Sequence, residues 1–209
     1  MSLVQEPPTI AEDASTPTAG IVPYLFTAEV FGRMIDAEVF ADEDRVELWD
    51  GWITAKMAKT QAHAASGINV TMTLVPVLPP GWCLSGENPV ALGPKSTPLP
   101  DFAVLRGRGG NYATRRPSPG DVGLLVELSL TSLRADVGSK LAAYAAANIA
   151  VYWVLNLVEN VILVFERPIP AERRYESAQS FAVGQAVPFR LDGALVAEIP
   201  VIDLLPIEG

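Results

Sequence analysis

The sequence predicts a single domain of the α/β class (α+β type) built around a central sheet. Two apolar runs, FAVL at 102–105 and VGLLVEL at 122–128, lack strict alternation, which is typical of strands covered on both faces. A helical pattern then runs from Ser132 to about Asn148. Two more strand-like runs, 151–157 and 161–168, follow it around a turn near Glu159-Asn160. We therefore place 102–105 and 122–128 at the centre of the sheet.

The region before these strands is predicted to contain two helices and a hairpin. Residues 1–23 are rich in Pro, Thr, Ala and acids and read as an N-terminal arm, which leaves 24–209 as the folded domain. A helix is expected over 27–40, with Thr27 as its N-cap. The Asp50-Gly51 pair predicts a tight turn that joins strands 45–49 and 52–57.

A second helix is expected within 60–78, where Ile68, Met72 and Val75 share one face. Pro76 and the Pro79-Pro80 pair end it. Short strands are expected near 82–85 and 90–92, and further strand-like segments follow 168 and end at Leu204-Leu205.

Composition restricts the possible functions. The net charge of −9 argues against non-specific nucleic-acid binding, because that binding depends on neutralising phosphates with Lys and Arg. Cys83 is the only cysteine, so no intramolecular disulfide or cysteine-based zinc site can form, and a reducing cytoplasm is expected. Neither a secretory signal nor a membrane segment is predicted. No small organic cofactor is expected.

Two acids flank the predicted central strands. Asp101 opens the strand at 102–105, and Glu127 lies near the end of the strand at 122–128. If these strands are antiparallel neighbours, both carboxylates lie at the same end of the sheet. Burying an isolated carboxylate is costly unless it is paired or binds a metal, and Mg²⁺ prefers such oxygen ligands. The alternatives are that Glu127 reaches solvent and that Asp101 is a turn residue.

Lys140 lies on the flank of the predicted helix stripe of Val137, Leu141, Tyr144 and Asn148. From there its ammonium could reach the acids and orient an attacking water. The competing interpretation is an i,i+4 surface pair with Asp136. Spacing alone does not decide between the two.

Other polar residues are weaker candidates. Glu47 lies within an apolar strand and could be a further ligand or an orienting group. His63, the sole histidine, is expected to cap the second helix or to pack against it, and the alternative is that it lines the cleft. The loop between the central strands holds the one local concentration of positive charge, although a solvated loop also explains it. Its arginines are Arg106, Arg108, Arg115 and Arg116. The antiparallel arrangement puts this loop at the opposite end from the acids, so DNA contact would require the loop to fold back or a second subunit. A homodimer is therefore expected.

Several segments together resemble the Uma-two family of proposed restriction endonucleases, within the PD-(D/E)XK nuclease superfamily. They are ELWDGWITAKM, His63, PDFAVL and the stretch from VELSL to WVLNL. The likeness runs from about Thr27 to the C-terminus. Its most specific block contains Glu127, Ser129, Ser132, Asp136, Lys140, Tyr144 and Tyr152-Trp153.

The resemblance implies a restriction-endonuclease-like mixed sheet flanked by helices, with Asp101 and Glu127 as ligands of a divalent ion. The superfamily lysine usually follows the acid by two residues, where this chain has Ser129, so the resemblance implies Lys140 instead. Glu47 and His63 match a family acid and a family histidine. The usual Gly-Ile-Pro-Glu-Tyr-Trp is here Asn148 to Trp153, and Leu130 replaces a residue that is often polar.

Three functions follow from these observations. The first is a Mg²⁺-dependent (or Mn²⁺-dependent) DNA endonuclease, in which Asp101, Glu127 and the Leu128 carbonyl hold the ion and Lys140 positions the nucleophile, with Ser129, Ser132 and Asp136 as possible cleft residues. The second is a catalytically silent binding or assembly module with the same fold, which the acidic charge favours. The third, hydrolysis of a glycosidic bond by the carboxylate pair, lacks any feature for sugar stacking.

Overall fold

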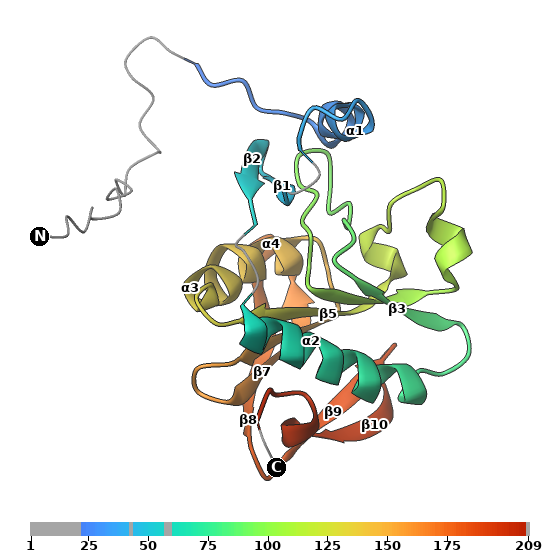
Figure 1. Ribbon diagram of the computed structural model, residues 1–209, viewed down its shortest axis with the longest axis vertical. Helices are drawn as coiled ribbons and strands as arrows, with labels where there is room; N and C mark the ends of the chain where they lie inside the picture. Colours follow the sequence, from blue (N-terminus) through green and yellow to red (C-terminus); the bar gives the residue numbers. More distant parts are fainter. Residues whose placement is uncertain (1–21, 42–43, 57–59, 208–209) are drawn as a thin grey trace, which may run out of the picture.

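A six-stranded mixed sheet of order β3-β4-β5-β6-β7-β8 forms the centre of the computed structural model, which describes residues 22–41, 44–56 and 60–207 (Figure 1). β5 and β6 pair in parallel, and the other neighbours are antiparallel. The predicted mixed sheet, with the two apolar runs near its centre, is confirmed. The strands are β3 Trp82–Gly86, β4 Phe102–Arg106, β5 Val122–Ser129, β6 Val151–Asn156, β7 Val161–Ile169 and β8 Arg174–Ala182.

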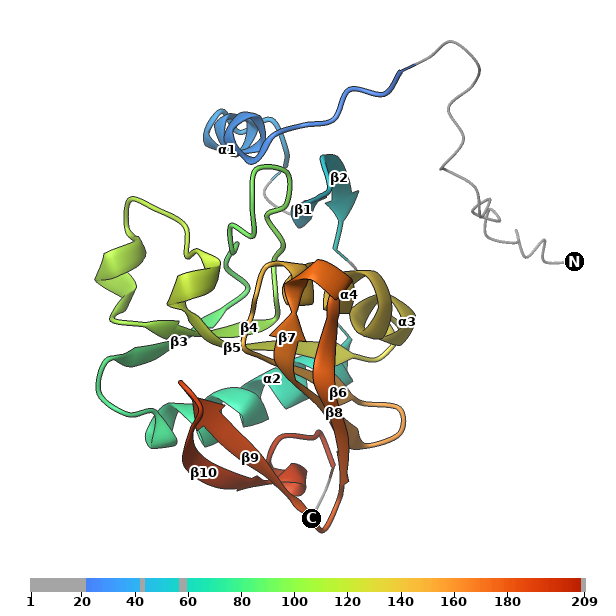
Figure 2. The ribbon, with the colours of Figure 1, turned by 180° about the vertical axis from the view of Figure 1, so that it is seen from behind.

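One face of the sheet is covered by α2 (Gln61–Leu74) and by the hairpin of β9 (Ala186–Leu191) and β10 (Ala194–Pro200) (Figures 1 and 2). Val70 and Leu74 of α2 pack in one cluster with Trp153 of β6 and Phe189 of β9. Every residue of β5 is buried, because the sheet is also covered on its other face.

The opposite face is covered by the helical connection between the parallel strands β5 and β6. It consists of α3 (Leu133–Ala135), a π-helical segment (Asp136–Lys140) and α4 (Leu141–Ala146). Tyr144 and Ala145 pack there with Leu125 and Tyr152. The rings of Tyr144 and Tyr152 meet edge to face, with centroids 4.9 Å apart.

The N-terminal elements form a separate layer above this face (Figure 1). They are α1 (Ala28–Asp36) and the antiparallel hairpin of β1 (Val46–Trp49) and β2 (Trp52–Ala55). Thr27 caps α1 as predicted, and its hydroxyl accepts a hydrogen bond from the Val30 N–H. Asp50 and Gly51 both have positive φ (47° and 88°), as expected for the hairpin turn.

Two expectations for the segment between β2 and β4 are wrong. Residues 90–92 do not form a strand, because their backbone N–H groups bond to three separate acceptors, the carbonyls of Pro98, Pro117 and Ser96. The face of α2 that holds Ile68 and Met72 is exposed, at 64% and 71%. The buried face instead consists of Ser66, Val70 and Leu74.

The predicted apolar stripe of the 132–148 helix also needs correction. Val137 is 36% exposed, whereas Asp136 is fully buried. The π-helical segment Asp136–Lys140 adds a residue to one turn, so the 3.6-residue period used for the prediction loses its phase there. Tyr144 keeps its predicted place in the core, and Asn148 lies beyond the helix end with φ of 61°.

The predicted N-terminal arm, 1–23, lies outside the described residues except for 22 and 23. Within the described part of the chain, no helix has the length and apolarity needed to cross a membrane.

Gly123 forms a β-bulge in β5, where the strand lies very close to the side chains of Trp82 and Leu191. Val104 pairs with Leu124 and Leu105 with Val122, so Gly123 is the extra residue on β5. A Cβ added at Gly123 would lie 2.5 Å from the Trp82 ring and 2.6 Å from the Leu191 side chain. The position therefore requires glycine because it lacks space for any side chain.

Gly123→Ala is expected to lower the free energy of unfolding by about 1–3 kcal/mol, since overpacking forces neighbouring side chains to move. Urea denaturation measures this loss. Gly120→Ala is the matched control, because a Cβ there meets no atom within 4 Å. Equal stability of the two variants would contradict the proposed packing constraint.

Candidate active site

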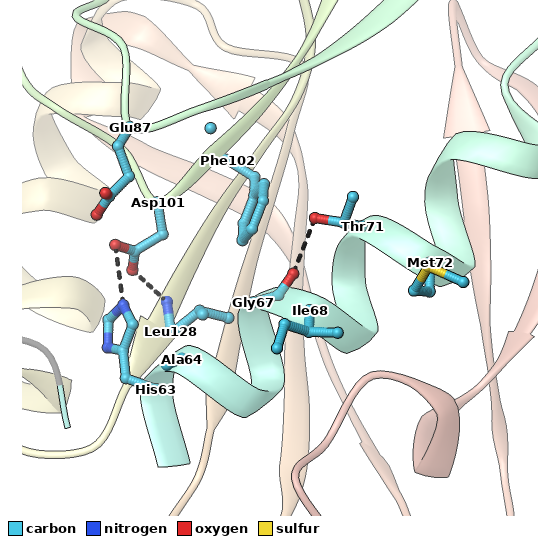
Figure 3. A pocket seen from close by; sticks show the side chains of 11 residues that line it. His63, Ala64, Gly67, Ile68, Thr71, Met72, Glu87, Asp101, Phe102 and Leu128 are labelled. Atoms are coloured by element: carbon cyan, nitrogen blue, oxygen red, sulfur yellow. Dashed lines mark hydrogen bonds and ion pairs between the residues drawn. The ribbon is translucent and has the colours of Figure 1, made fainter. Parts of the chain in front are cut away.

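Asp101 and Glu127 meet at one end of the β4–β5 pair. Phe102 is opposite Val126, so the next residues outward, Asp101 and Glu127, lie side by side at that end. Both side chains are buried, with 2% exposure of each residue. The Leu128 N–H donates a hydrogen bond of 2.7 Å to Asp101 Oδ2 and fixes the plane of that carboxylate (Figure 3).

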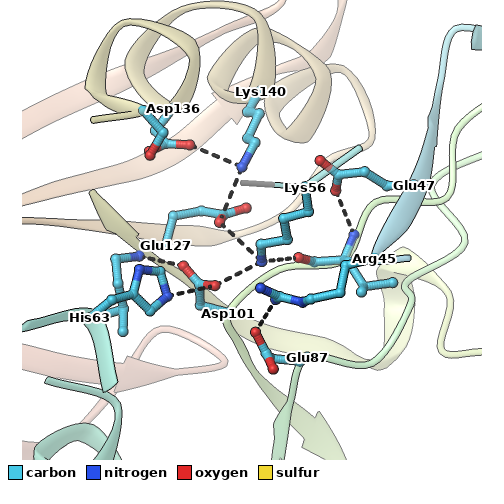
Figure 4. A network of polar contacts seen from close by, with 12 residues as sticks. Arg45, Glu47, Lys56, His63, Glu87, Asp101, Glu127, Asp136 and Lys140 are labelled. Carbon is cyan, nitrogen blue, oxygen red and sulfur yellow. Dashed lines mark hydrogen bonds and ion pairs between the residues drawn. The ribbon is translucent and has the colours of Figure 1, made fainter. Parts of the chain in front are cut away.

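Two cationic or ionisable nitrogens approach the other oxygen of Asp101. His63, in the first turn of α2, places Nε2 3.2 Å from Oδ1. Lys56, directly after β2, places Nζ 2.7 Å from the same oxygen (Figure 4). The same Nζ lies 4.0 Å from Glu127 Oε2, so one ammonium nitrogen lies near both carboxylates.

Glu127 has partners on both of its oxygens. The Tyr144 hydroxyl donates a hydrogen bond of 2.7 Å to Oε1. Lys140 Nζ lies 3.2 Å from Oε2 and 3.0 Å from Asp136 Oδ1. Lys140 therefore reaches the strand acid. It also makes the i,i+4 pair with Asp136, but that pair is buried and does not lie on the surface, as the competing interpretation had it.

The remaining predicted residues surround this centre. Glu47 is buried and its Oε2 accepts a hydrogen bond of 2.9 Å from the Leu99 N–H, which holds the loop before Asp101. Ser132 donates to Asp136 Oδ2 at 2.5 Å. Ser129 is buried, and among the described residues its hydroxyl has no hydrogen-bond partner.

A cavity of about 180 Å³ opens onto these groups, and it adjoins a larger pocket of about 460 Å³ (Figure 3). His63, Asp101 and Leu128 line both. The smaller cavity is lined by polar side chains from several elements, among them Glu47, Lys56, Thr60, Glu127, Ser132 and Lys140. The larger one is mostly apolar and includes Gly67, Ile68, Met72 and Phe102.

The arginine-rich loop is not part of this cluster. Arg106 ends β4, at the opposite end from Asp101, where its guanidinium pairs with Asp192 and lies 4.5 Å from the Trp82 ring centroid. Arg115 pairs with Asp121 at 2.7 Å. Arg108 and Arg116 belong to the same loop, and none of the four arginines lines the cavity at the acids.

A family model described as "putative restriction endonuclease" matches residues 29–194. The chain belongs to this family, Uma2. The match includes both strand acids, both lysines and His63, so the whole cluster lies within the Uma2 region. The resemblance inferred from the sequence motifs is confirmed.

Among solved structures, this Uma2 protein is similar to a crystal structure described as a putative nuclease belonging to DUF820, from Anabaena variabilis. The TM-score is 0.62 at 16% sequence identity, over 76% of this chain and 88% of the other. The similarity confirms the fold. None of the curated proteins matches the chain.

The two acids of the Uma2 protein differ in proton affinity. Burial would raise the pKa of Asp101, but the hydrogen bond from His63 and the positive charge of Lys56 outweigh it, and the pKa lies below its ordinary value. Burial raises the pKa of Glu127 to about 7, against the attraction of Lys140 and with a further rise from the Asp101 charge. Burial would lower the pKa of Lys140, but the negative charges of Glu127 and Asp136 outweigh this effect and raise it. The pair thus combines a firmly ionised acid with one that titrates near neutrality.

The oxygen atoms at the acid pair decide which metal the site could hold. Among the described residues, no group of three or more His, Cys, Asp and Glu side chains is arranged to hold a metal. Asp101 and Glu127 do supply two hard oxygen ligands beside a cavity, and Mg²⁺ is commonly held by one or two carboxylates plus waters and substrate phosphate. The residues therefore fit Mg²⁺ or Mn²⁺ bound by a minimal protein shell, and the ligand role of the Leu128 carbonyl stays a prediction.

Lys56 and Tyr144 contact the acids, and the sequence interpretation assigned neither of them that role. A signal for Lys56 existed in the hairpin: Glu47 is opposite Thr54, so the alternation of strand side chains puts Lys56 on the same face as Glu47. No comparable signal identified Tyr144, whose apolar neighbours indicated only a core position.

The raised pKa of Glu127 predicts a pH-dependent stability for the metal-free protein. Between its ordinary value of 4.5 and about 7, the folded state binds this proton more tightly than the unfolded state, so stability falls as pH rises through that window. The loss should reach roughly 3 kcal/mol relative to Glu127→Gln, since one pKa unit corresponds to about 1.4 kcal/mol. Urea denaturation in EDTA at several pH values measures it.

Glu176→Gln is the control for this experiment, because Glu176 is an exposed acid paired with Arg167. It should follow the wild-type profile. Parallel profiles of wild type and Glu127→Gln from pH 4.5 to 7 would show that Glu127 does not titrate as described.

Proposed function

We propose that this protein is a Mg²⁺-dependent endonuclease that hydrolyses phosphodiester bonds in DNA. One observation carries the proposal: two buried carboxylates, Asp101 and Glu127, lie beside one cavity at the end of adjacent strands, within reach of Lys140. Membership in the Uma2 family supports the assignment to nuclease chemistry.

Asp101 and Glu127 are the proposed metal ligands, with the Leu128 carbonyl as a third. A bound divalent ion supplies an acidified water and stabilises negative charge on the phosphoryl oxygens. The protein contributes ligand positions that are fixed before the ion arrives. The Leu128 N–H holds Asp101 and the Tyr144 hydroxyl holds Glu127, so neither carboxylate needs to reorganise.

Lys140 is the proposed residue for positioning the nucleophile. Its ammonium is held between Glu127 and Asp136, and Asp136 is itself fixed by Ser132. An ammonium at that place can hold a water in the polar cavity and favour its deprotonated form. Glu47 has a supporting role through its bond to the loop before Asp101.

The apolar pocket beside the acids is the proposed seat of the sugar and base next to the cleaved bond. Gly67 and Gly86 lie beside the Phe102 ring, and a Cβ on either would be 3.5 Å from it. Because neither glycine has a side chain, the space next to the ring in this pocket stays open. Bases stack on aromatic side chains with little sequence preference. This pocket compensates in part for the distance of the arginine loop from the acids.

Asp101→Asn and Glu127→Gln are expected to abolish Mg²⁺ and Mn²⁺ binding in calorimetric titration. Plasmid nicking should fall by about a hundredfold or more, because the ion supplies most of the charge stabilisation. Glu176→Gln, at an exposed acid, should bind metal and nick DNA like wild type. A wild type that binds no divalent ion, or nicking unchanged by both substitutions, would refute the nuclease assignment.

Lys140→Gln is expected to separate binding from chemistry. Nicking should fall by about a hundredfold, the usual scale for a proton-transfer or positioning group, while the divalent ion still binds. Lys95→Gln, at an exposed lysine outside the site, controls for the change in net charge. Nicking by Lys140→Gln at the wild-type rate would leave Lys140 only a structural role in its pairs with Glu127 and Asp136.

The second candidate function is a catalytically silent binding or assembly module. The net charge of −9 favours it, because an acidic protein repels nucleic acid. The two candidates differ in one measurable respect: the silent module binds no divalent ion at Asp101 and Glu127.

A homodimer and a cytoplasmic location stay predictions. The homodimer is expected because the arginine loop of one subunit would have to serve the acids of another.

A further inference from the structure

We infer that Lys56 is a built-in counter-ion that competes with the divalent ion for the acid pair and so sets the metal affinity of the site. The inference rests on the proposed function, since it concerns the same two carboxylates. It assigns to Lys56 a role different from that of Lys140.

The position of the ammonium carries the first step. Lys56 Nζ lies 2.7 Å from Asp101 Oδ1 and 4.0 Å from Glu127 Oε2, and its side chain is 8% exposed (Figure 4). An ion bound to Oδ1 at about 2.1 Å would lie no more than roughly 5 Å from this nitrogen. The Lys56 ammonium is therefore a close neighbour of any ion that Asp101 Oδ1 holds.

Electrostatics carries the second step. An ammonium and a divalent cation so close together repel strongly in a buried site, where screening by solvent is weak. Either Lys56 moves away when the ion binds or the ion binds weakly. In both cases Lys56 makes the net free energy of metal binding less favourable, either through the cost of its displacement or through its repulsion of the ion.

The two lysines differ in the partners that each would keep after a divalent ion binds the acids. Lys140 also pairs with Asp136 at 3.0 Å, so it keeps an anionic partner when an ion takes Glu127. Besides the two acids, Lys56 donates to the uncharged Leu99 carbonyl. Lys56 is thus the cation that the metal displaces, and Lys140 is the one that stays.

In the metal-free protein, Lys56 compensates the burial of Asp101. A buried carboxylate without a counter-charge is strongly destabilising. Lys56 thereby stabilises the folded site in the absence of metal, and it also lowers the affinity of the site for the divalent ion.

Calorimetric titration of the full chain with MgCl₂ and MnCl₂ tests the inference. Lys56→Met should bind either ion about tenfold more tightly or better, because the competing charge is gone. Lys56→Arg keeps the charge and should bind as weakly as wild type. Lys95→Met makes the same substitution at an exposed lysine and should leave the affinity unchanged.

Thermal denaturation provides the second readout. Metal-free Lys56→Met should melt below wild type, and saturating Mn²⁺ should raise its melting temperature by more than it raises that of wild type. If Lys56→Met does not fold, Lys56→Gln replaces it, with the same expected direction.

The outcomes separate this inference from the proposed function. Metal binding by wild type that Asp101→Asn abolishes, with equal affinity in wild type and Lys56→Met, overturns the role of Lys56 and leaves the nuclease proposal intact. Absence of binding in wild type and all Lys56 variants overturns both. Metal binding by wild type that Asp101→Asn abolishes and that Lys56→Met strengthens about tenfold or more supports both.

Discussion

The burial of two carboxylates side by side at the end of β4 and β5 is the constraint on which the rest of the site depends. Each would be costly to bury alone, and together they also repel each other. Three side-chain nitrogens offset this cost: the ammonium groups of Lys56 and Lys140, and His63 beside Asp101. The strand acids therefore need the N-terminal hairpin, α2 and the β5–β6 connection around them.

This arrangement also explains why the acids have different ionisation behaviour. Asp101 receives a backbone N–H and two side-chain nitrogens, whereas Glu127 receives one hydroxyl and one close ammonium while it faces the Asp101 charge. The environment thus divides two chemically similar groups into a fixed anion and a titratable one. Such a division is common where carboxylates take part in chemistry.

Local patterns in the sequence were sufficient for the sheet and for its two acids. The apolar runs at 102–105 and 122–128 predicted buried strands because full burial leaves no alternation, and the Asp50-Gly51 turn predicted the hairpin. The face of α2 and the phase of the 132–148 helix could not be predicted in the same way. Ile68 and Met72 are apolar yet exposed, and the π-helical turn breaks the period that places Asp136 inside. Lys56 was missed because its partner lies 45 residues away and the contact depends on how the hairpin docks.

The docked hairpin has a consequence for how the molecule folds. β1 and β2 form their own two-stranded sheet, so they can pair locally and early, while the bond from Lys56 to Asp101 closes a loop of 45 residues. Contacts of that range carry a loop-closure cost that local pairing does not. The acid pair can thus be brought together by the central strands before its cation arrives. The acid pair therefore obtains the Lys56 ammonium only through the docking of the hairpin on the central sheet, which completes the site.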